Sequence, residues 1–184
     1  MAYTSNITEE MISLMRGFFT MPVISNLGRL GAIEAMSSLG EFTADDIKQI
    51  PNKAVLLTAF RYLARLGLLE ERNMQKNIFS ITDFGKEIFG RHSSFYVPHS
   101  YHEYMNSFEE LLKNDSKFTG REVNRLENVI GSGLTHRRYF LSAISLLKRK
   151  VSFESIVDVG CGNGYFLKET LKEFTDKQAI GVDI

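Results

Sequence analysis

One short stretch near the end of the sequence constrains the fold more than any other. Residues 156–159 form a brief, β-branched apolar run, and three glycines follow within five positions, at Gly160, Gly162 and Gly164. Apolar residues at helical spacing come next. A strand, a glycine turn and a helix in this order bring backbone N–H groups at a helix N-terminus close to a ligand, with no Cβ in the way.

A second strand completes this unit. The apolar run 179–182 ends at the carboxylate of Asp183. We predict that the first run, 156–159, is a buried strand, because it is short, β-branched and stopped by glycine. The sequence therefore predicts a βαβ half of a nucleotide-binding sheet, with the ligand at the carboxyl ends of the strands.

The spacing of the glycines separates two kinds of nucleotide site. Dinucleotide-binding turns carry glycine at the first, third and sixth positions, but the sixth position counted from Gly160 is Tyr165. The stretch from Asp158 to Gly164 instead carries an acid two residues before its first glycine. It resembles motif I of the class I S-adenosylmethionine-dependent methyltransferases. Asp183, 23 residues after Gly160, is similar to that family's acid at the end of the second strand.

The resemblance implies a site for the cofactor S-adenosylmethionine. The candidate cofactor-binding residues are Asp158, Gly160, Cys161, Gly162, Asn163, Gly164 and Asp183. The resemblance further implies that the glycines pass close to the methionine and ribose parts of the cofactor. It implies that Asp158 orients the amino group of the cofactor and that Asp183 accepts hydrogen bonds from its ribose hydroxyls. A carboxylate suits a cis-diol because it is a bidentate acceptor. The alternative is an ordinary glycine turn, with Asp183 beginning a loop.

Composition limits the classes of function. Lys+Arg and Asp+Glu both number 22 among 184 residues, so no global charge points to nucleic acid, and the apolar content of 43% is enough for a core. Cys161 is the only cysteine, which excludes an intramolecular disulfide and a cysteine-based zinc cluster. We expect a cytoplasmic protein, because the sequence shows neither a secretory signal nor an apolar run long enough to span a membrane.

The first half of the sequence has the element order of a winged helix. We expect helices over 8–20, Pro22–Ser38, Thr43–Ile50 and Pro51–Gly67, strands over 68–71 and 78–82, and a helix capped by Thr82. This order, with the stretches 60–70 and 79–85, resembles the N-terminal dimerisation domain of the small-molecule O-methyltransferases. The resemblance implies a homodimer formed through this domain.

The expected fold class is a mainly α N-terminal winged-helix domain followed by the β-α-β start of an α/β Rossmann-like methyltransferase domain. We divide the chain into a dimerisation domain over 1–92, linker helices and a loop over 93–134, and an incomplete S-adenosylmethionine-binding domain over 135–184. Within these limits we predict a glycine-dotted loop around a short helical piece over 114–134 and a helix over Thr135–Lys150.

The sequence offers three candidate residues for the acceptor pocket and no candidate catalytic residue. Tyr104, Met105 and Phe108 lie on a helical stripe, and in the resembling family the helices that link the domains help line the acceptor pocket; the alternative is interdomain core. We assign no metal, because the histidines follow no metal-ligand pattern. The catalytic residues are unknown, since the family's base is a histidine well downstream and His136 precedes the glycine motif.

The implied reaction is transfer of a sulfonium methyl group to an oxygen, or less often a nitrogen, of a small acceptor, with an aromatic one favoured. The family places its adenine pocket, base and much of its acceptor site after the second strand. We therefore interpret the sequence as the N-terminal part of a methyltransferase and predict that the chain alone transfers no methyl group.

Two alternatives stay open, a non-catalytic dimerising remnant and a winged-helix DNA-binding regulator. The regulator would use the basic residues Lys53, Arg61, Arg65, Arg72 and Lys76. Nucleic acid is a disfavoured partner, because residues 1–100 hold ten basic and ten acidic side chains, whereas a groove-reading domain normally carries a net positive charge.

Overall fold

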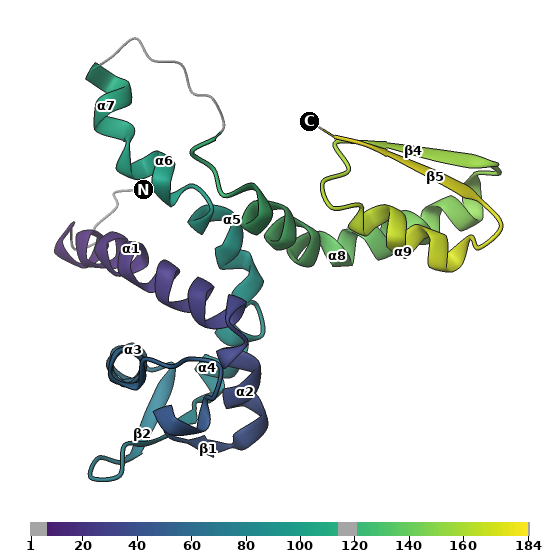
Figure 1. Ribbon diagram of the computed structural model, residues 1–184. Coiled ribbons are helices and arrows are strands. Elements are labelled where there is room, and N and C mark those ends of the chain that lie inside the picture. Colours follow the sequence, from purple (N-terminus) through teal and green to yellow (C-terminus); the bar gives the residue numbers. More distant parts are fainter. Residues whose placement is uncertain (1–6, 114–120, 184) are drawn as a thin grey trace. The chain divides into compact units, whose positions relative to one another are not determined.

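The computed structural model describes residues 7–113 and 121–183, and the chain divides into two compact units, Met1–Phe95 and Tyr96–Ile184. Each unit is described by itself (Figure 1). Unit 1 contains α1 (Ile7–Arg29), α2 (Ala32–Leu39), β1 (Glu41–Phe42), η1 (Ala44–Asp46), α3 (Lys53–Arg65), β2 (Leu69–Asn73), β3 (Ile78–Ile81), α4 (Asp83–Phe89) and η2 (His92–Phe95). Unit 2 contains α5 (Tyr96–His99), α6 (His102–Asn106), α7 (Phe108–Lys113), α8 (Arg125–Lys150), β4 (Ser155–Val159), α9 (Tyr165–Glu173) and β5 (Gln178–Val182).

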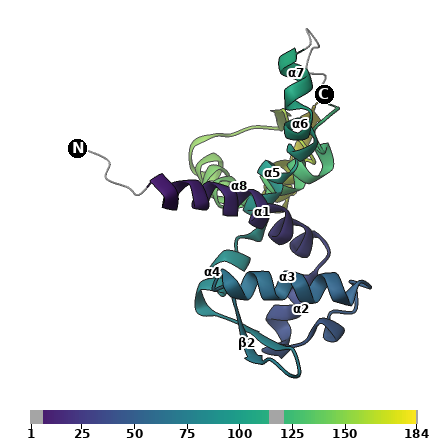
Figure 2. The same cartoon turned by 90° about the vertical axis from the view of Figure 1, so that its left-hand side faces the viewer.

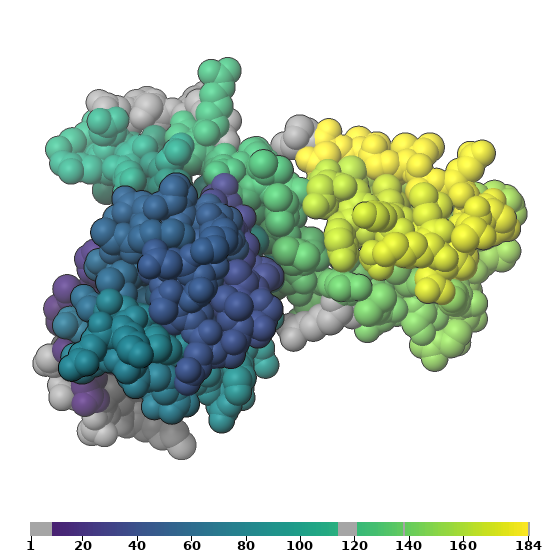
Figure 3. Space-filling view, turned by 60° about the horizontal axis from the view of Figure 1, so that its bottom comes forward, coloured from purple at the N-terminus to yellow at the C-terminus, as the bar shows by residue number. Residues whose placement is uncertain are grey.

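Unit 1 packs its helices against a three-stranded antiparallel sheet in the order β1-β3-β2. The short strand β1, which the sequence did not predict, pairs Phe42 with Phe79 of β3. Phe60 of α3 lies between these two rings, with ring centroids 5.3 Å from Phe42 and 5.5 Å from Phe79, and all three are buried. Figure 2 shows α3 and β2 of this unit, and Figure 3 shows the face, in blue and teal, that its middle elements form.

Two of the local signals predicted in unit 1 are confirmed, the boundaries of α3 and the capping box at Thr43. Asn52 caps α3 by accepting a hydrogen bond from the backbone N–H of Val55, and Gly67 ends the helix with a φ of 75°. The backbone N–H and hydroxyl of Thr43 both donate to the Asp46 carboxylate. These bonds favour the charged carboxylate, so they hold the pKa of Asp46 below its usual value.

The predicted break at Pro22 is wrong, because α1 continues through Pro22 to Arg29. Proline leaves one helical carbonyl without a donor. Side chains around it add hydrogen bonds to the helix: the Thr20 hydroxyl donates to the Arg16 carbonyl, and the Asn26 amide donates to that of Pro22. The chain turns instead at Gly31, whose φ of 72° lies in the left-handed region that glycine tolerates best.

In unit 2 the long helix α8 begins at Arg125, so the predicted loop is wrong over residues 125–134, while residues 114–120 lie outside the described part. Asn124 caps α8 by accepting from the backbone N–H of Glu127. Gly131 lies where α5 crosses the helix: a Cβ built there would approach the Tyr96 Cβ to 2.6 Å. This glycine is therefore a site of close packing within a helix.

A buried polar cluster holds α5 against α8. The imidazole Nδ1 of His99 lies 2.8 Å from the Glu127 carboxylate, and both side chains are buried. The Asn128 amide donates to the Ser100 hydroxyl at 3.0 Å, and the Asn124 backbone N–H donates to the Ser100 carbonyl at 2.8 Å. Buried polar groups with partners of this kind fix the register of the two helices.

The strands β4 and β5 pair in parallel, from Ser155 with Gln178 to Val159 with Val182, with α9 connecting them. The prediction that the first strand is buried is wrong, since Val157 and Val159 are 55% and 81% exposed. Figure 1 shows α9 along one side of the strand pair, with α8 beside α9. On the uncovered side, the paired residues Val157 and Ile180, and Val159 and Val182, are each at least half exposed. The names winged helix and Rossmann-like stay predictions for the two parts.

Candidate functional site

The glycine turn adopts the backbone that its sequence suggested. Gly160, Gly162 and Gly164 have φ values of 79°, 56° and 71°, all in the left-handed region, where a side chain is strained. Gly164 is also the residue that precedes the first turn of α9. A Cβ at Gly160 or Gly164 would meet no described atom within 4 Å, so the space beside the turn is open.

Asp183 is tied to this turn. Its carboxylate Oδ2 accepts a hydrogen bond of 2.6 Å from the Gly162 backbone N–H. One residue earlier, the Val182 carbonyl accepts from the N–H groups of Gly160 and Cys161, at 2.7 and 3.2 Å. The ends of β4 and β5 are therefore connected through the backbone of the turn, and the Asp183 carboxylate is held next to the glycines.

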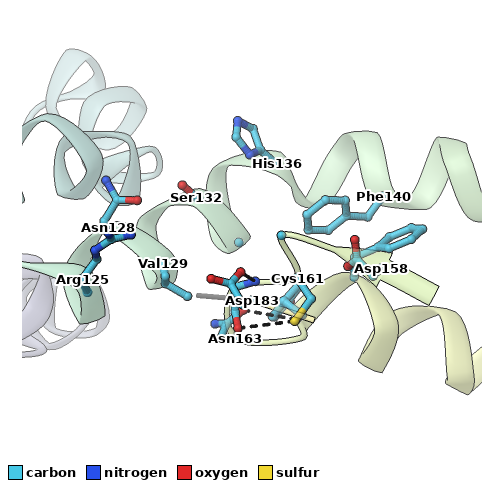
Figure 4. A pocket seen from close by; sticks show the side chains of 15 residues that line it. Arg125, Asn128, Val129, Ser132, His136, Phe140, Asp158, Cys161, Asn163 and Asp183 are labelled. Atoms are coloured by element: carbon cyan, nitrogen blue, oxygen red, sulfur yellow. Dashed lines mark hydrogen bonds between the residues drawn. The ribbon is translucent and has the colours of Figure 1, made fainter. Parts of the chain in front are cut away.

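A cavity of about 380 Å³ opens at this point (Figure 4). Of the seven candidate cofactor-binding residues, six line it: Asp158, Gly160, Cys161, Gly162, Asn163 and Asp183. Gly164 does not line the cavity and instead shapes the start of α9. The sequence positions that carried the prediction thus lie together around one cavity, within the size range of ligand pockets, about 300–1,000 Å³.

The opposite wall of the cavity belongs to α8 and was missed in the sequence. Its lining residues on this helix include Arg125, Asn128, Ser132, His136 and Phe140. They recur every three or four positions, so they occupy one face of α8. The assignment of 125–134 to a loop concealed the first three of these positions, whereas His136 and Phe140 lie in the helix predicted over Thr135–Lys150.

Charge is distributed unevenly over the two walls. The turn side contributes the carboxylates of Asp158 and Asp183, and α8 contributes the guanidinium of Arg125, the imidazole of His136 and the hydroxyl of Ser132. The cavity can therefore accept hydrogen bonds on one side and donate them on the other. Among the described residues there is no group of three or more His, Cys, Asp or Glu side chains placed to bind a metal ion.

Cys161 packs against the second strand. A Cβ built at Gly181 would lie 2.7 Å from the Cys161 Sγ, so the thiol occupies the space that the glycine leaves. A small residue at each position lets the turn and β5 come together. This packing explains Cys161 without any reactive role.

The three candidate acceptor residues lie away from this cavity lining. Tyr104 and Met105 are on α6, and Phe108 begins α7. Tyr104 and Phe108 contact edge to face with centroids 6.2 Å apart. Met105 and Phe108 are 57% and 42% exposed. Their role in an acceptor pocket stays a prediction.

The basic residues considered for DNA binding are partly engaged within unit 1. The Arg72 guanidinium lies 3.0 Å from the Glu70 carboxylate and also donates to the Ser80 hydroxyl. The Arg61 guanidinium donates to the Asn77 amide oxygen at 2.8 Å. Neighbouring carboxylates lower the net positive charge of the hairpin, which disfavours a groove-reading surface.

Comparison with known proteins rests on structure, because no family model and no curated sequence matches the chain. The fold is similar to human N-acetylserotonin methyltransferase in complex with SAM, with a TM-score of 0.64 and 13% identity over the whole chain. It is also similar to the mitomycin 7-O-methyltransferase MmcR, with a TM-score of 0.59 and 13% identity over 95% of the chain. It is similar as well to an O-methyltransferase family protein from Burkholderia thailandensis, with a TM-score of 0.54 and 12% identity over 98% of the chain.

The chain spans about three fifths of these structures, covering 61%, 57% and 57% of their lengths. At such identities the likeness establishes the fold alone: the chain has the fold of a part of small-molecule O-methyltransferases. Separately, no helix among the described residues combines the length and apolar character needed to cross a membrane.

Proposed function

We propose that this chain is the cofactor-binding N-terminal portion of an S-adenosylmethionine-dependent methyltransferase that acts on an oxygen of a small metabolite. The observation that carries the proposal is the cavity at the glycine turn, where Asp158, the backbone of Gly160 and Gly162, and Asp183 meet. The fold likeness supports it, since the solved structures with this fold are named as methyltransferases.

The cavity fits the cofactor chemically. Three left-handed glycines keep Cβ atoms out of the space beside the turn, which allows a ligand to approach the backbone closely. In the proposed arrangement Asp158 accepts from the ammonium group of the methionine part. The Asp183 carboxylate, which the Gly162 N–H holds beside the turn, accepts hydrogen bonds from the ribose hydroxyls. The cofactor supplies an electrophilic methyl group on a sulfonium centre.

The chain's own residues position and shield the cofactor. The turn holds the ligand from one side and α8 from the other, which orients it and removes water from its surface. We assign no general base among the described residues. Tyr104, Met105 and Phe108 remain the proposed acceptor wall, and a small, aromatic acceptor is the class that their side chains favour.

The proposed partner is a second copy of the chain, bound through unit 1. On α1 a set of large apolar side chains is exposed: Met11, Leu14, Met15, Phe18 and Phe19. A helix with apolar residues on several sides is normally covered. Two copies related by a twofold axis would cover the same surface on each other. The cytoplasm remains the proposed compartment, on the sequence grounds given above.

Calorimetric titration of the chain with S-adenosylhomocysteine tests the cofactor assignment. We expect one site per chain. Asp183→Ala should weaken binding at least tenfold, because the ribose hydroxyls lose a charged acceptor. Asp176→Ala is the matched control, since this exposed carboxylate pairs with Lys177 and does not line the cavity. A folded chain that binds no S-adenosylhomocysteine, or an Asp176→Ala variant as weak as Asp183→Ala, would contradict the assignment.

A further inference from the structure

Unit 1 has a cavity of its own, which the proposed function does not use. It has a volume of about 620 Å³ and opens where α3 lies beside β2 (Figure 2) and the turn that follows this strand. Its lining residues all belong to unit 1: Arg61, Ala64, Arg65, Leu69, Glu70, Glu71 and Met74. None of them lines the cavity at the glycine turn.

Part of this lining is apolar. It is supplied by Ala64 of α3, Leu69 of β2 and Met74 in the turn after β2. Met74 is 76% exposed, so a ligand that covered it would remove a large apolar side chain from water. The cavity can therefore bind the apolar part of a small molecule.

The two arginines of the lining differ in their partners. The Arg61 guanidinium donates to the Asn77 amide oxygen at 2.8 Å, which holds it against the hairpin. Arg65 lies one turn further along α3 and has no hydrogen bond or ion pair with any residue that the structure describes. Its guanidinium is therefore available to a carboxylate of a ligand, which it can bind through two N–H groups.

Glu71 presents the opposite charge to the same cavity. Its side chain is 20% exposed, but its Oε1 atom is buried and has no hydrogen-bond partner within the described part of the chain. The Arg61 Nε lies 3.9 Å from this oxygen, which is too far for a hydrogen bond. A carboxylate oxygen that is buried without a donor costs free energy, so a donor group on a ligand would be stabilised beside Glu71.

We propose that this cavity binds an α-amino acid with a large apolar side chain. Arg65 binds its carboxylate and Glu71 binds its ammonium group, while the apolar lining residues contact its side chain. Two arginines and two glutamates line the cavity, so their charges balance and match a zwitterion better than an anion or a cation. The inference goes beyond the proposed function, because it gives unit 1 a binding site for a second small molecule.

Amide NMR titration of the ¹⁵N-labelled chain with L-phenylalanine tests the site. Two matched ligands each lack one charged group: 3-phenylpropionate keeps the carboxylate alone, and 2-phenylethylamine keeps the ammonium group alone. We expect shifts within residues 61–74. L-phenylalanine should bind about tenfold more tightly than either analogue, because each analogue loses one hydrogen bond between charged groups.

Two variants assign the charged groups. Arg65→Ala should weaken L-phenylalanine binding about tenfold and leave 2-phenylethylamine within about twofold, because the amine has no carboxylate. Glu71→Gln should weaken L-phenylalanine and leave 3-phenylpropionate within about twofold, because the acid has no ammonium group. Arg91→Ala is the control, since Arg91 is an exposed arginine of unit 1 that does not line the cavity.

Equal affinity for the three ligands would overturn the inference, because the cavity would then bind apolar compounds whatever their charge. Absence of shifts within residues 61–74, or an Arg65→Ala chain that binds L-phenylalanine as tightly as Arg91→Ala, would overturn it as well. The comparison of ligands on the wild-type chain needs no variant, so it decides the question even if Arg65→Ala is unstable. Binding of S-adenosylhomocysteine is measured separately, so failure here leaves the proposed function standing.

Discussion

Gly85 shows how one residue can hold an element in place. It lies in α4, where the backbone passes so close to the start of the hairpin that a built Cβ would stand 2.0 Å from the Leu68 carbonyl oxygen. The Thr82 hydroxyl accepts from the Gly85 N–H and donates to the Gly67 carbonyl, which ties α4 to the same point. No side chain fits there without a backbone shift.

We therefore expect Gly85→Ala to lower the free energy of unfolding by about 3 kcal/mol, as overpacking against rigid backbone does. Gly17→Ala is the matched control: it lies in α1, and a Cβ there meets no described atom within 4 Å. That substitution should stabilise the helix by up to about 1 kcal/mol. Urea unfolding of both variants checks the difference. Equal stabilities would show that the close approach at Leu68 is absent in solution.

At the residue scale, the sequence indicated positions that the structure brings close together, while their role in binding stays a prediction. Asp158, the three glycines and Asp183 were placed by short-range spacing, because a strand, a turn and a helix fix one another's geometry locally. His136 was set aside for preceding the motif. Its place in the cavity depends on α8 packing against α9, a tertiary contact that spacing within one segment does not reveal.

At the scale of elements, local signals and packing decided different boundaries. The start of α3 at Asn52 and its end at Gly67 follow from capping chemistry, so the sequence predicted them. Pro22 and Gly131 were interpreted as breaks because both disfavour helix. In the structure the helix continues through each of them. At Gly131 the close approach of α5 explains why the helix carries a glycine.

The α5–α8 crossing gives a prediction for α8. Gly131→Ala should destabilise the chain by about 1–3 kcal/mol, because the new methyl would lie 2.6 Å from the Tyr96 Cβ and 3.0 Å from the Val97 nitrogen. Gly133→Ala, two residues away on the same helix, meets its nearest atom at 3.4 Å and should be neutral or slightly stabilising. Thermal unfolding separates the two. A stable Gly131→Ala variant would mean that α5 does not pack here.

At the scale of the whole molecule, exposed apolar surface is the dominant feature. The valines of β4 are exposed, and so are the large apolar side chains of α1, here called the α1 stripe: Met11, Leu14, Met15, Phe18 and Phe19. The first strand was predicted as buried because its apolar run is short, β-branched and stopped by glycine. Burial of this kind depends on what packs across the sheet, which lies outside the residues of the strand itself.

The α1 stripe predicts self-association. Leu14 is 77% exposed and Phe18 is 63% exposed, so replacing both with Glu should desolvate two charges in any twofold interface and shift the chain to monomer. Met74→Glu is the control, at an equally exposed apolar residue on the hairpin of unit 1. Sedimentation velocity measures the outcome. A wild-type chain that stays monomeric at high micromolar concentration would contradict the proposed homodimer.

The measurement that tests the central claim most directly is an amide NMR titration of the ¹⁵N-labelled chain with S-adenosylhomocysteine. Binding at the glycine turn predicts shifts for Gly160, Gly162, Asp183 and the cavity face of α8, with little change over residues 7–95. Shifts confined to α3 and the hairpin of unit 1, or none at saturating ligand, would contradict a cofactor site at the ends of β4 and β5.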